Sequence, residues 1–234
     1  MTPQLRIRRG VGIVQKHAVL PGTSPNYFSS SNAGEITSDW TIVAKFTAPD
    51  YTPAAEIGIA GQYQLVGNLR NFLASIQTGA AATRTSSDGT LEGEVDSSTA
   101  LTDTDNVETT LRWRYDLDDG GGNRAAYFDR WTGSWTAIGT SPVTAVGTVA
   151  SVFNSSAVVM IGGILNGATL LLAWAGNVKR IQAFNSLNSA GTPFGGATLL
   201  WDFNPNDYVS GTSWTSSTTG ETWDIIGTAS VVND

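Results

Sequence analysis

The sequence predicts an all-β protein, built as a sandwich or barrel from many short antiparallel strands. Apolar residues alternate with polar ones in segments 39–47 and 110–115, as Trp40, Ile42 and Phe46 illustrate. A period of two places the apolar side chains on one face of a strand. Clusters of Gly, Asn, Asp, Ser and Thr separate such segments at intervals of about ten residues, which indicates turns. We find no run of about twelve residues with amphipathic helical spacing.

Along the whole chain, apolar alternation and turn clusters together predict a set of strands and loops. Segments 78–87 and 96–106 are rich in small and polar residues, so we expect loops there, each too short to link two domains. Residues 187–190 are expected to form at most one turn of helix. Strands are expected at 39–47, 56–60, 72–77, 110–115, 125–131, 157–161, 177–185, 199–203, 222–226 and 229–232. Their alternation assigns Trp40, Trp113, Trp174 and Trp201 to the core.

Length and composition exclude several classes of protein. The chain has 234 residues, and a sandwich of roughly 200–250 residues is commonly one domain. It has no cysteine, which excludes disulfide scaffolds, zinc ribbons and cysteine nucleophiles. Its net charge of −7 argues against nucleic-acid binding. The longest apolar run, 170–175, is far shorter than the ~20 residues of a membrane span, and no secretory signal is readable.

The N-terminal segment differs in charge from the rest of the chain. Arg6, Arg8, Arg9 and Lys16 are four of the 13 basic residues, and the remainder is acidic. We expect residues 1–20 to be an arm that docks on an acidic partner, or an edge strand with a charged outer face. Residues 21–234 would form a single β-sandwich domain. The only histidine, His17, lies in this segment and is interpreted as a surface side chain, because no Gly-x-Ser-x-Gly motif accompanies it.

One region resembles a known family. The run Ile161-Gly162-Gly163 is followed by Trp-Ala-Gly-Asn-Val-Lys-Arg-Ile-Gln-Ala-Phe-Asn at 174–185. This pattern resembles the late strands of laminin-G-like, concanavalin-A-like jelly rolls. Val178, Ile181 and Ala183 would be the buried set. The step from Val178 to Ile181 is odd, so a β-bulge is expected between them to keep both side chains inside.

Two further segments narrow the resemblance. Residues 111–123 run into a second strand, and the ending contains Asp-Phe-Asn-Pro at 202–205 and Thr-Gly-Glu-Thr-Trp at 219–223. This layout is similar to laminin-G-like modules in virion proteins of tailed bacteriophages, especially minor tail proteins, over about Phe28 to Val232.

The resemblance implies a jelly roll of two antiparallel sheets. It also implies a non-enzymatic structural protein of the virion exterior, either a minor tail protein or a capsid decoration protein. Expected partners are other virion proteins, further copies of this chain, with a trimer as one arrangement, and host surface glycans bound weakly and multivalently.

Two other functions use the same fold. A laminarinase-type glycoside hydrolase places paired carboxylates on one strand face, roughly 5 Å apart. Glu92, Glu94 and Asp96 alternate in this way, but their order differs from the laminarinase pattern and Gly93 weakens the strand. We therefore predict no enzymatic activity. A cellular carbohydrate-binding module is the remaining alternative, and the lack of a readable secretory signal argues against it.

Two hairpins carry the candidate ligand sites. Trp131 and Trp135 flank a tight turn, where they either stack on sugar rings or staple the hairpin across its strands. Asp116, Asp118, Asp119 and Asn123 surround three glycines. These residues either form a plain hairpin turn or bind Ca²⁺ weakly through their oxygen atoms, although the twelfth position of an EF-hand loop is Tyr127. No other cofactor is expected.

Overall fold

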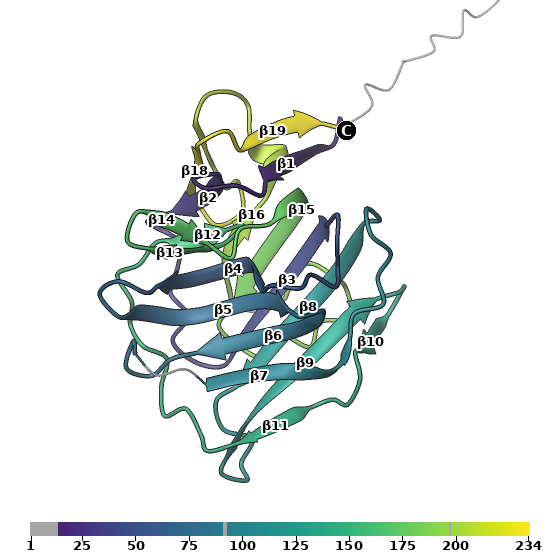
Figure 1. Ribbon diagram of the computed structural model, residues 1–234, viewed down its shortest axis with the longest axis vertical. Coiled ribbons are helices and arrows are strands. Elements are labelled where there is room, and N and C mark those ends of the chain that lie inside the picture. The colour runs from purple at the N-terminus through teal and green to yellow at the C-terminus, as the bar shows by residue number, and fades with distance from the viewer. Residues whose placement is uncertain (1–13, 91–92, 197) are drawn as a thin grey trace, which may run out of the picture.

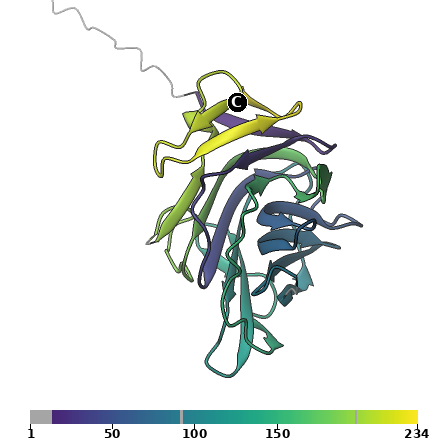
Figure 2. The ribbon, with the colours of Figure 1, turned by 90° about the vertical axis from the view of Figure 1, so that its left-hand side faces the viewer.

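Two β-sheets packed face to face form the molecule, as Figures 1 and 2 show from two sides. The computed structural model describes residues 14–90, 93–196 and 198–234. The strand pairs in this part of the chain are antiparallel, apart from a parallel contact between Leu165 and Gln64, and an isolated parallel bridge joins Asn123 to Gly147. The all-β jelly-roll sandwich expected from the sequence is confirmed.

Sheet A holds the strands on which the candidate site is built. It is ordered β10-β9-β8-β3-β15-β1-β19, with β11 paired to β9 and β16 paired to β15. The bounds are β10 Trp135–Ala137, β9 Asn123–Trp131, β8 Thr109–Asp116, β3 Trp40–Thr47, β15 Ala175–Phe184, β1 Lys16–Pro21, β19 Ser230–Asn233, β11 Val143–Val146 and β16 Leu199–Phe203.

Sheet B forms the other layer. It is ordered β17-β18-β2-β12-β4-β5-β6-β7, and the small hairpin β13–β14 joins it at β4. The bounds are β17 Ser213–Thr215, β18 Thr222–Ile226, β2 Tyr27–Ser30, β12 Val159–Ile161, β4 Ile57–Gln64, β5 Leu69–Gln77, β6 Ala80–Thr85, β7 Gly93–Ala100, β13 Ile164–Asn166 and β14 Thr169–Leu171. A single 3₁₀ turn, η1, spans Pro205–Asp207.

Each of the ten expected strands overlaps an observed strand, but the two loop expectations were wrong. Segment 78–87 contains β6, and segment 96–106 begins inside β7. Residues 187–190, where at most one helical turn was expected, form none. In β6 the inward side chains are Ala81, Thr83 and Thr85, which are small but fully buried. Small side chains give no strong apolar alternation, and this hid the strand in the sequence.

Residues 16–20 also differ from the arm or edge strand that was expected for the N-terminal segment. Ala18 and Val19 pair with β15 on one side and with β19 on the other. Residues 16–20 are therefore an interior part of sheet A, neither a free arm nor an edge strand, because β19 supplies the outer edge. Arg6, Arg8 and Arg9 lie outside the described residues.

The core between the sheets is strongly aromatic. Trp40, Trp113 and Trp201 have no exposed surface and Trp174 is 3% exposed, which confirms their assignment to the core. Trp223 is also fully buried. The last strands bring Phe203 edge-on to Trp214 and Trp223, with ring centroids 5.3 and 5.0 Å apart. Phe203, Trp214 and Trp223 therefore complete the core and are unavailable to a ligand.

The predicted bulge in β15 is present. The register of β15 against β3 shifts between Val178 and Arg180, so both Val178 and Ile181 point into the core. Just before it, Gly176 has φ +152, and a Cβ there would lie 2.2 Å from the Trp174 ring and 2.3 Å from the Thr47 carbonyl oxygen. A glycine is required at this position because the tryptophan ring occupies the side-chain space.

Candidate functional site

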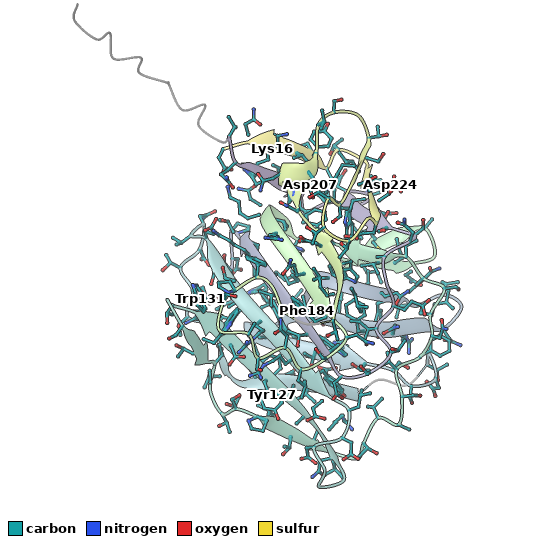
Figure 3. All side chains as sticks on the ribbon, turned by 180° about the vertical axis from the view of Figure 1, so that it is seen from behind. Lys16, Tyr127, Trp131, Phe184, Asp207 and Asp224 are labelled. Atoms are coloured by element: carbon teal, nitrogen blue, oxygen red, sulfur yellow. The ribbon has the colours of Figure 1, made fainter. Side chains whose placement is uncertain are left out.

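The candidate site lies on the outer face of sheet A, which is turned away from sheet B. Alternation along β8 sends Leu111, Trp113 and Tyr115 into the core, so Arg112 and Arg114 point outward. Arg112 pairs with Asp129 of β9, and Arg114 pairs with Tyr127. Figure 3 views this face and labels Tyr127, Trp131 and Phe184 on it.

A loop lies across the middle of this face. Residues 185–196, which we call the strap, follow β15 and cross over β3 and β8, and the outward residues Thr41, Val43, Gln182 and Phe184 are buried. Thr41 Oγ1 donates to the Ser186 carbonyl at 2.7 Å and accepts from the Asn188 amide at 2.8 Å. Gln182 Oε1 accepts from the Gly195 amide at 2.9 Å. The strap is therefore fastened by side chains of the sheet, and it divides the face into two ends.

The aromatic hairpin lies at one end. Trp131 and Trp135 are directly opposite across β9 and β10, with their rings edge to face and the centroids 5.3 Å apart. Trp135 Nε1 donates to the Ala190 carbonyl of the strap at 3.0 Å. The cross-strand pair is thus present, and Trp135 is also engaged by the strap. Trp131 is half-buried, and its indole makes no such hydrogen bond to the strap in the described structure. Sugar stacking by these two rings stays a prediction.

A nearly buried ion cluster supports the hairpin from below. Arg112 Nη2 and Arg114 Nη2 lie 2.9 and 3.0 Å from Asp129 Oδ2, and the Asp129 side chain is 7% exposed. The Arg112 guanidinium lies 4.2 Å from the Trp135 ring centroid, and that of Arg114 lies 4.6 Å from the Tyr127 ring. Burial lowers the pKa of Arg112, while Asp129 acts in the opposite direction. The cluster holds the rings in place through cation–π contacts.

A small hollow of about 160 Å³ lies on the reverse side of the same hairpin. Threonine hydroxyls from β7, β10 and the adjoining loops line it, together with Arg130 of β9. Arg130 is held there by Asp103, at 2.5 Å, and by Thr102 Oγ1, at 3.1 Å. These hydroxyls offer neutral hydrogen-bonding groups on the side of the hairpin that faces away from the two indoles.

The Asp116–Asn123 loop closes the β8–β9 hairpin, as expected. Asp116 Oδ1 accepts from the Asp118 amide, Asp118 Oδ1 from Gly120, and Asp119 Oδ1 from Gly121, at 2.7–3.1 Å. Gly120 and Gly122 supply the positive φ angles of the turn. Burial raises the pKa of Asp116. Among residues 14–90, 93–196 and 198–234, no group of three or more His, Asp and Glu side chains is arranged to hold a metal ion. Weak calcium binding stays the untested alternative to a plain hairpin turn.

The carboxylates considered for catalysis lie on the other sheet. Glu94 and Asp96 are on the outer face of β7, and Glu94 forms an ion pair with Arg84 at 3.2 Å. The Arg84 guanidinium also contacts Glu56 at 2.7 Å. Burial raises the pKa of both Glu56 and Asp96. Glu92 lies outside the described residues.

The remaining candidates lie at the opposite end of sheet A. Lys16 Nζ donates to the Tyr208 carbonyl, and the ammonium lies 5.9 Å from the centre of the Tyr208 ring. His17 Nδ1 lies 2.5 Å from Asp234 Oδ1, so the histidine interacts with the C-terminal strand and not with a serine nucleophile. Figure 3 shows Lys16 far from Trp131 of the aromatic hairpin.

Sequence reasoning missed the ion cluster and Tyr127 as parts of the site. The available signal was the charge on alternate positions of β8, where Arg112 and Arg114 interleave with buried residues. We had used that alternation only to identify the strand. The strap could not be found from the sequence, because most of the contacts that fix it join distant positions, such as Thr41 with Ser186 and Trp135 with Ala190.

Solved structures share this architecture. The chain is 13% identical to a native heptameric SAP-like pentraxin from Limulus polyphemus, over 95% of this chain and 96% of that one, with a TM-score of 0.57. It is 11% identical to a candidate carbohydrate-binding protein from Bacteroides ovatus, over 94% of this chain and 60% of that one, with a TM-score of 0.61. A weaker match, with a TM-score of 0.48, is to domains LG4-5 of the mouse laminin alpha1 chain, 12% identical over 72% of this chain and 42% of that one. The first two likenesses confirm the jelly-roll fold that the sequence resemblance implied.

Other comparisons add no family assignment. A scan against protein-family models found no match, and a search of curated proteins found none either. In the described part of the chain, no helix is both long and apolar enough to cross a membrane.

Proposed function

We propose that this chain is a non-enzymatic glycan-binding β-sandwich whose binding surface is the aromatic hairpin of sheet A. The observation that carries the proposal is the half-exposed Trp131, held edge-on to Trp135 at 5.3 Å above a fixed ion cluster. The apolar C–H face of a sugar stacks on such a ring, and a rigid ring loses little entropy when it binds. The fold shared with a candidate carbohydrate-binding protein supports this reading.

The proposal assigns no catalytic role to the chain. Glu94 is paired with Arg84 on the outer face of sheet B, away from the aromatic hairpin. A retaining glycosidase needs two carboxyl groups about 5 Å apart at the sugar-binding surface. We expect no release of reducing sugar from β-glucans, and no change in Glu92→Gln or Glu94→Gln variants. Turnover that disappears in these variants would establish a hydrolase instead.

We further propose that the chain works in many copies on the exterior of a tailed-phage virion, where it contacts other virion proteins. The support is the sequence resemblance over about Phe28 to Val232. Linking weak sites gains roughly 10²–10⁴ in avidity without any new contact, so each copy can bind feebly. A cellular carbohydrate-binding module is the alternative. Flanking genes for tail or capsid proteins would support the virion role, and flanking genes for polysaccharide-degrading enzymes would support the alternative.

The glycan test uses the purified full chain on a glycan array, with monomeric and artificially multimerised protein compared. We expect the multimer to be retained by one class of neutral glycan and Trp131→Ala to abolish that retention without changing the melting temperature by more than a few degrees. Tyr27→Ala, which removes a half-buried ring from sheet B, is the matched control. Retention that survives Trp131→Ala would move the site away from the hairpin.

A further inference from the structure

All three lysines of the chain line one hollow on the outer face of sheet A, at the end opposite the aromatic hairpin. The hollow has a volume of about 270 Å³. Lys16 comes from β1, Lys45 from β3 and Lys179 from β15, and Arg180 lies beside Lys179. Figure 3 shows Lys16 at this end, close to Asp207. Strands far apart in the sequence thus bring every lysine to one place.

The arginine forms the fixed wall of this hollow, which we call the lysine hollow. Arg180 Nε and Nη2 donate to the two oxygens of Asp202, at 2.8 and 2.6 Å, and Asp202 is fully buried. The hydrogen bonds to Asp202 raise the pKa of Arg180. The other side of the guanidinium is covered by Phe194 of the strap, whose ring centre lies 5.0 Å away.

The lysines, by contrast, have partners that a ligand can replace. Lys45 Nζ lies 2.8 Å from Glu108, and both side chains are nearly 40% exposed. Exposed ion pairs of this kind contribute little to stability, because water and salt compete with them. Lys179 is paired with Asp234, whose side chain is 37% exposed, and Lys16 donates to a backbone carbonyl. These ammonium groups are available to turn toward an incoming anion.

The charge of the lining differs from that of the whole chain. Because Arg180 is paired with the buried Asp202, three lysines face two carboxylates in the lining, Glu108 and Asp234, whereas acidic residues outnumber basic ones by 20 to 13 overall. Asp207, which adds to the field at Arg180, has both oxygens bound to Ser217 at 2.9 and 3.0 Å. A cluster of lysines on an acidic protein attracts an anion locally, although the net charge of the chain repels it.

We propose that the lysine hollow binds the anionic group of an acidic saccharide, either a carboxylate or a sulfate. Lys45 and Lys179 contact the charge, and the amides of Asn204 and Asn206 with the Phe194 ring contact the sugar that carries it. Only the choice of a saccharide as carrier rests on the proposed glycan-binding function. The anion site itself uses none of the residues of the aromatic hairpin.

Affinity electrophoresis of the full chain tests this proposal. The probes are polygalacturonate for the carboxylate, dextran sulfate for the sulfate, and neutral dextran as the uncharged polymer. We expect one or both acidic polymers to retard the protein while dextran does not. A Lys45→Gln/Lys179→Gln variant should weaken the retarding interaction at least tenfold, and Lys45→Arg/Lys179→Arg should restore most of it. The acidic polymer that retards the natural protein but not the Lys45→Gln/Lys179→Gln variant identifies the anionic group.

An Arg70→Gln/Arg124→Gln variant is the matched control, because it also removes two positive charges, but at positions outside the hollow. Equal weakening in this control would show general attraction between charges and would overturn the proposal, as would the absence of retardation by both acidic polymers. Melting temperatures of all variants verify folding. Trp131→Ala separates the two sites: it should abolish retention of neutral glycans and leave polyanion binding unchanged, so either function can fail alone.

Discussion

The Arg112 guanidinium lies 4.2 Å from the centre of the Trp135 ring, and both residues donate to the same carbonyl of Ala190. Trp135 Nε1 reaches that oxygen at 3.0 Å and Arg112 Nη1 at 3.5 Å. The strap is therefore anchored by two residues of sheet A at the aromatic hairpin. Its position there depends on the indole N–H as well as on the ring.

This anchoring predicts the behaviour of Trp135→Phe, which keeps an aromatic ring but removes the N–H donor. We expect a loss of about 1 kcal/mol of unfolding free energy, because one net hydrogen bond is lost. Hydrogen exchange of the amides in 186–196 should become faster. Trp131→Phe is the control, since Trp131 lies opposite without that bond to the strap. Equal strap protection in both variants would contradict the anchoring role.

Gly176→Ala is expected to be strongly destabilising. The new Cβ would lie 2.2 Å from the Trp174 ring and 2.3 Å from the Thr47 carbonyl oxygen, at φ +152. Overpacking and backbone strain together should cost roughly 2–5 kcal/mol, measured by urea unfolding. Gly133→Ala, at φ +96 with open space around it, should show the strain alone and lose less. A smaller loss of unfolding free energy for Gly176→Ala than for Gly133→Ala would mean that the Trp174 ring moves aside to make room for the new Cβ.

The Asp116–Asn123 hairpin is closed by its own hydrogen bonds from backbone amides to carboxylates. We therefore expect the melting temperature to be the same in EDTA and in millimolar Ca²⁺. Saturation of a calcium site at 100 times its dissociation constant would add about 2.7 kcal/mol, which a melting curve detects easily. A calcium-dependent rise that Asp119→Asn abolishes would show that the loop binds the ion.

Asp96 should make the stability of the protein depend on pH. Burial and the neighbouring Glu94 raise its pKa above the ordinary 3.8. The folded chain then holds the proton more tightly than the unfolded chain, so stability falls as the pH rises from about 3.8 through the raised pKa. Asp96→Asn should raise the melting temperature at pH 7 and change nothing at pH 3, where Asp96 is protonated in both states. The exposed Asp224→Asn is the control. An equal rise in the melting temperature of Asp96→Asn at pH 7 and at pH 3 would show that the raised pKa of Asp96 is not the cause.

The sequence by itself determined the fold class, most strands and the aromatic core. Alternation depends only on neighbouring residues, so β3, β8 and β9 could be identified directly. The odd step that follows Val178 also predicted the bulge in β15. Strands made of small residues, such as β6, were lost, since alanine and threonine alternate too weakly in hydrophobicity to distinguish a strand from a loop.

Only the tertiary structure decided the site. The strap covers Thr41 and binds Trp135 through contacts that span 55 to 147 residues of sequence. Lys45 and Lys179 lie far apart in the sequence, and Lys16 was assigned there to the basic N-terminal segment. Strand order alone brings β1, β3 and β15 together. Periodicity reports which face of a strand a residue occupies. It carries no information about which strands become neighbours, because sheet order is set by the packing of the whole core.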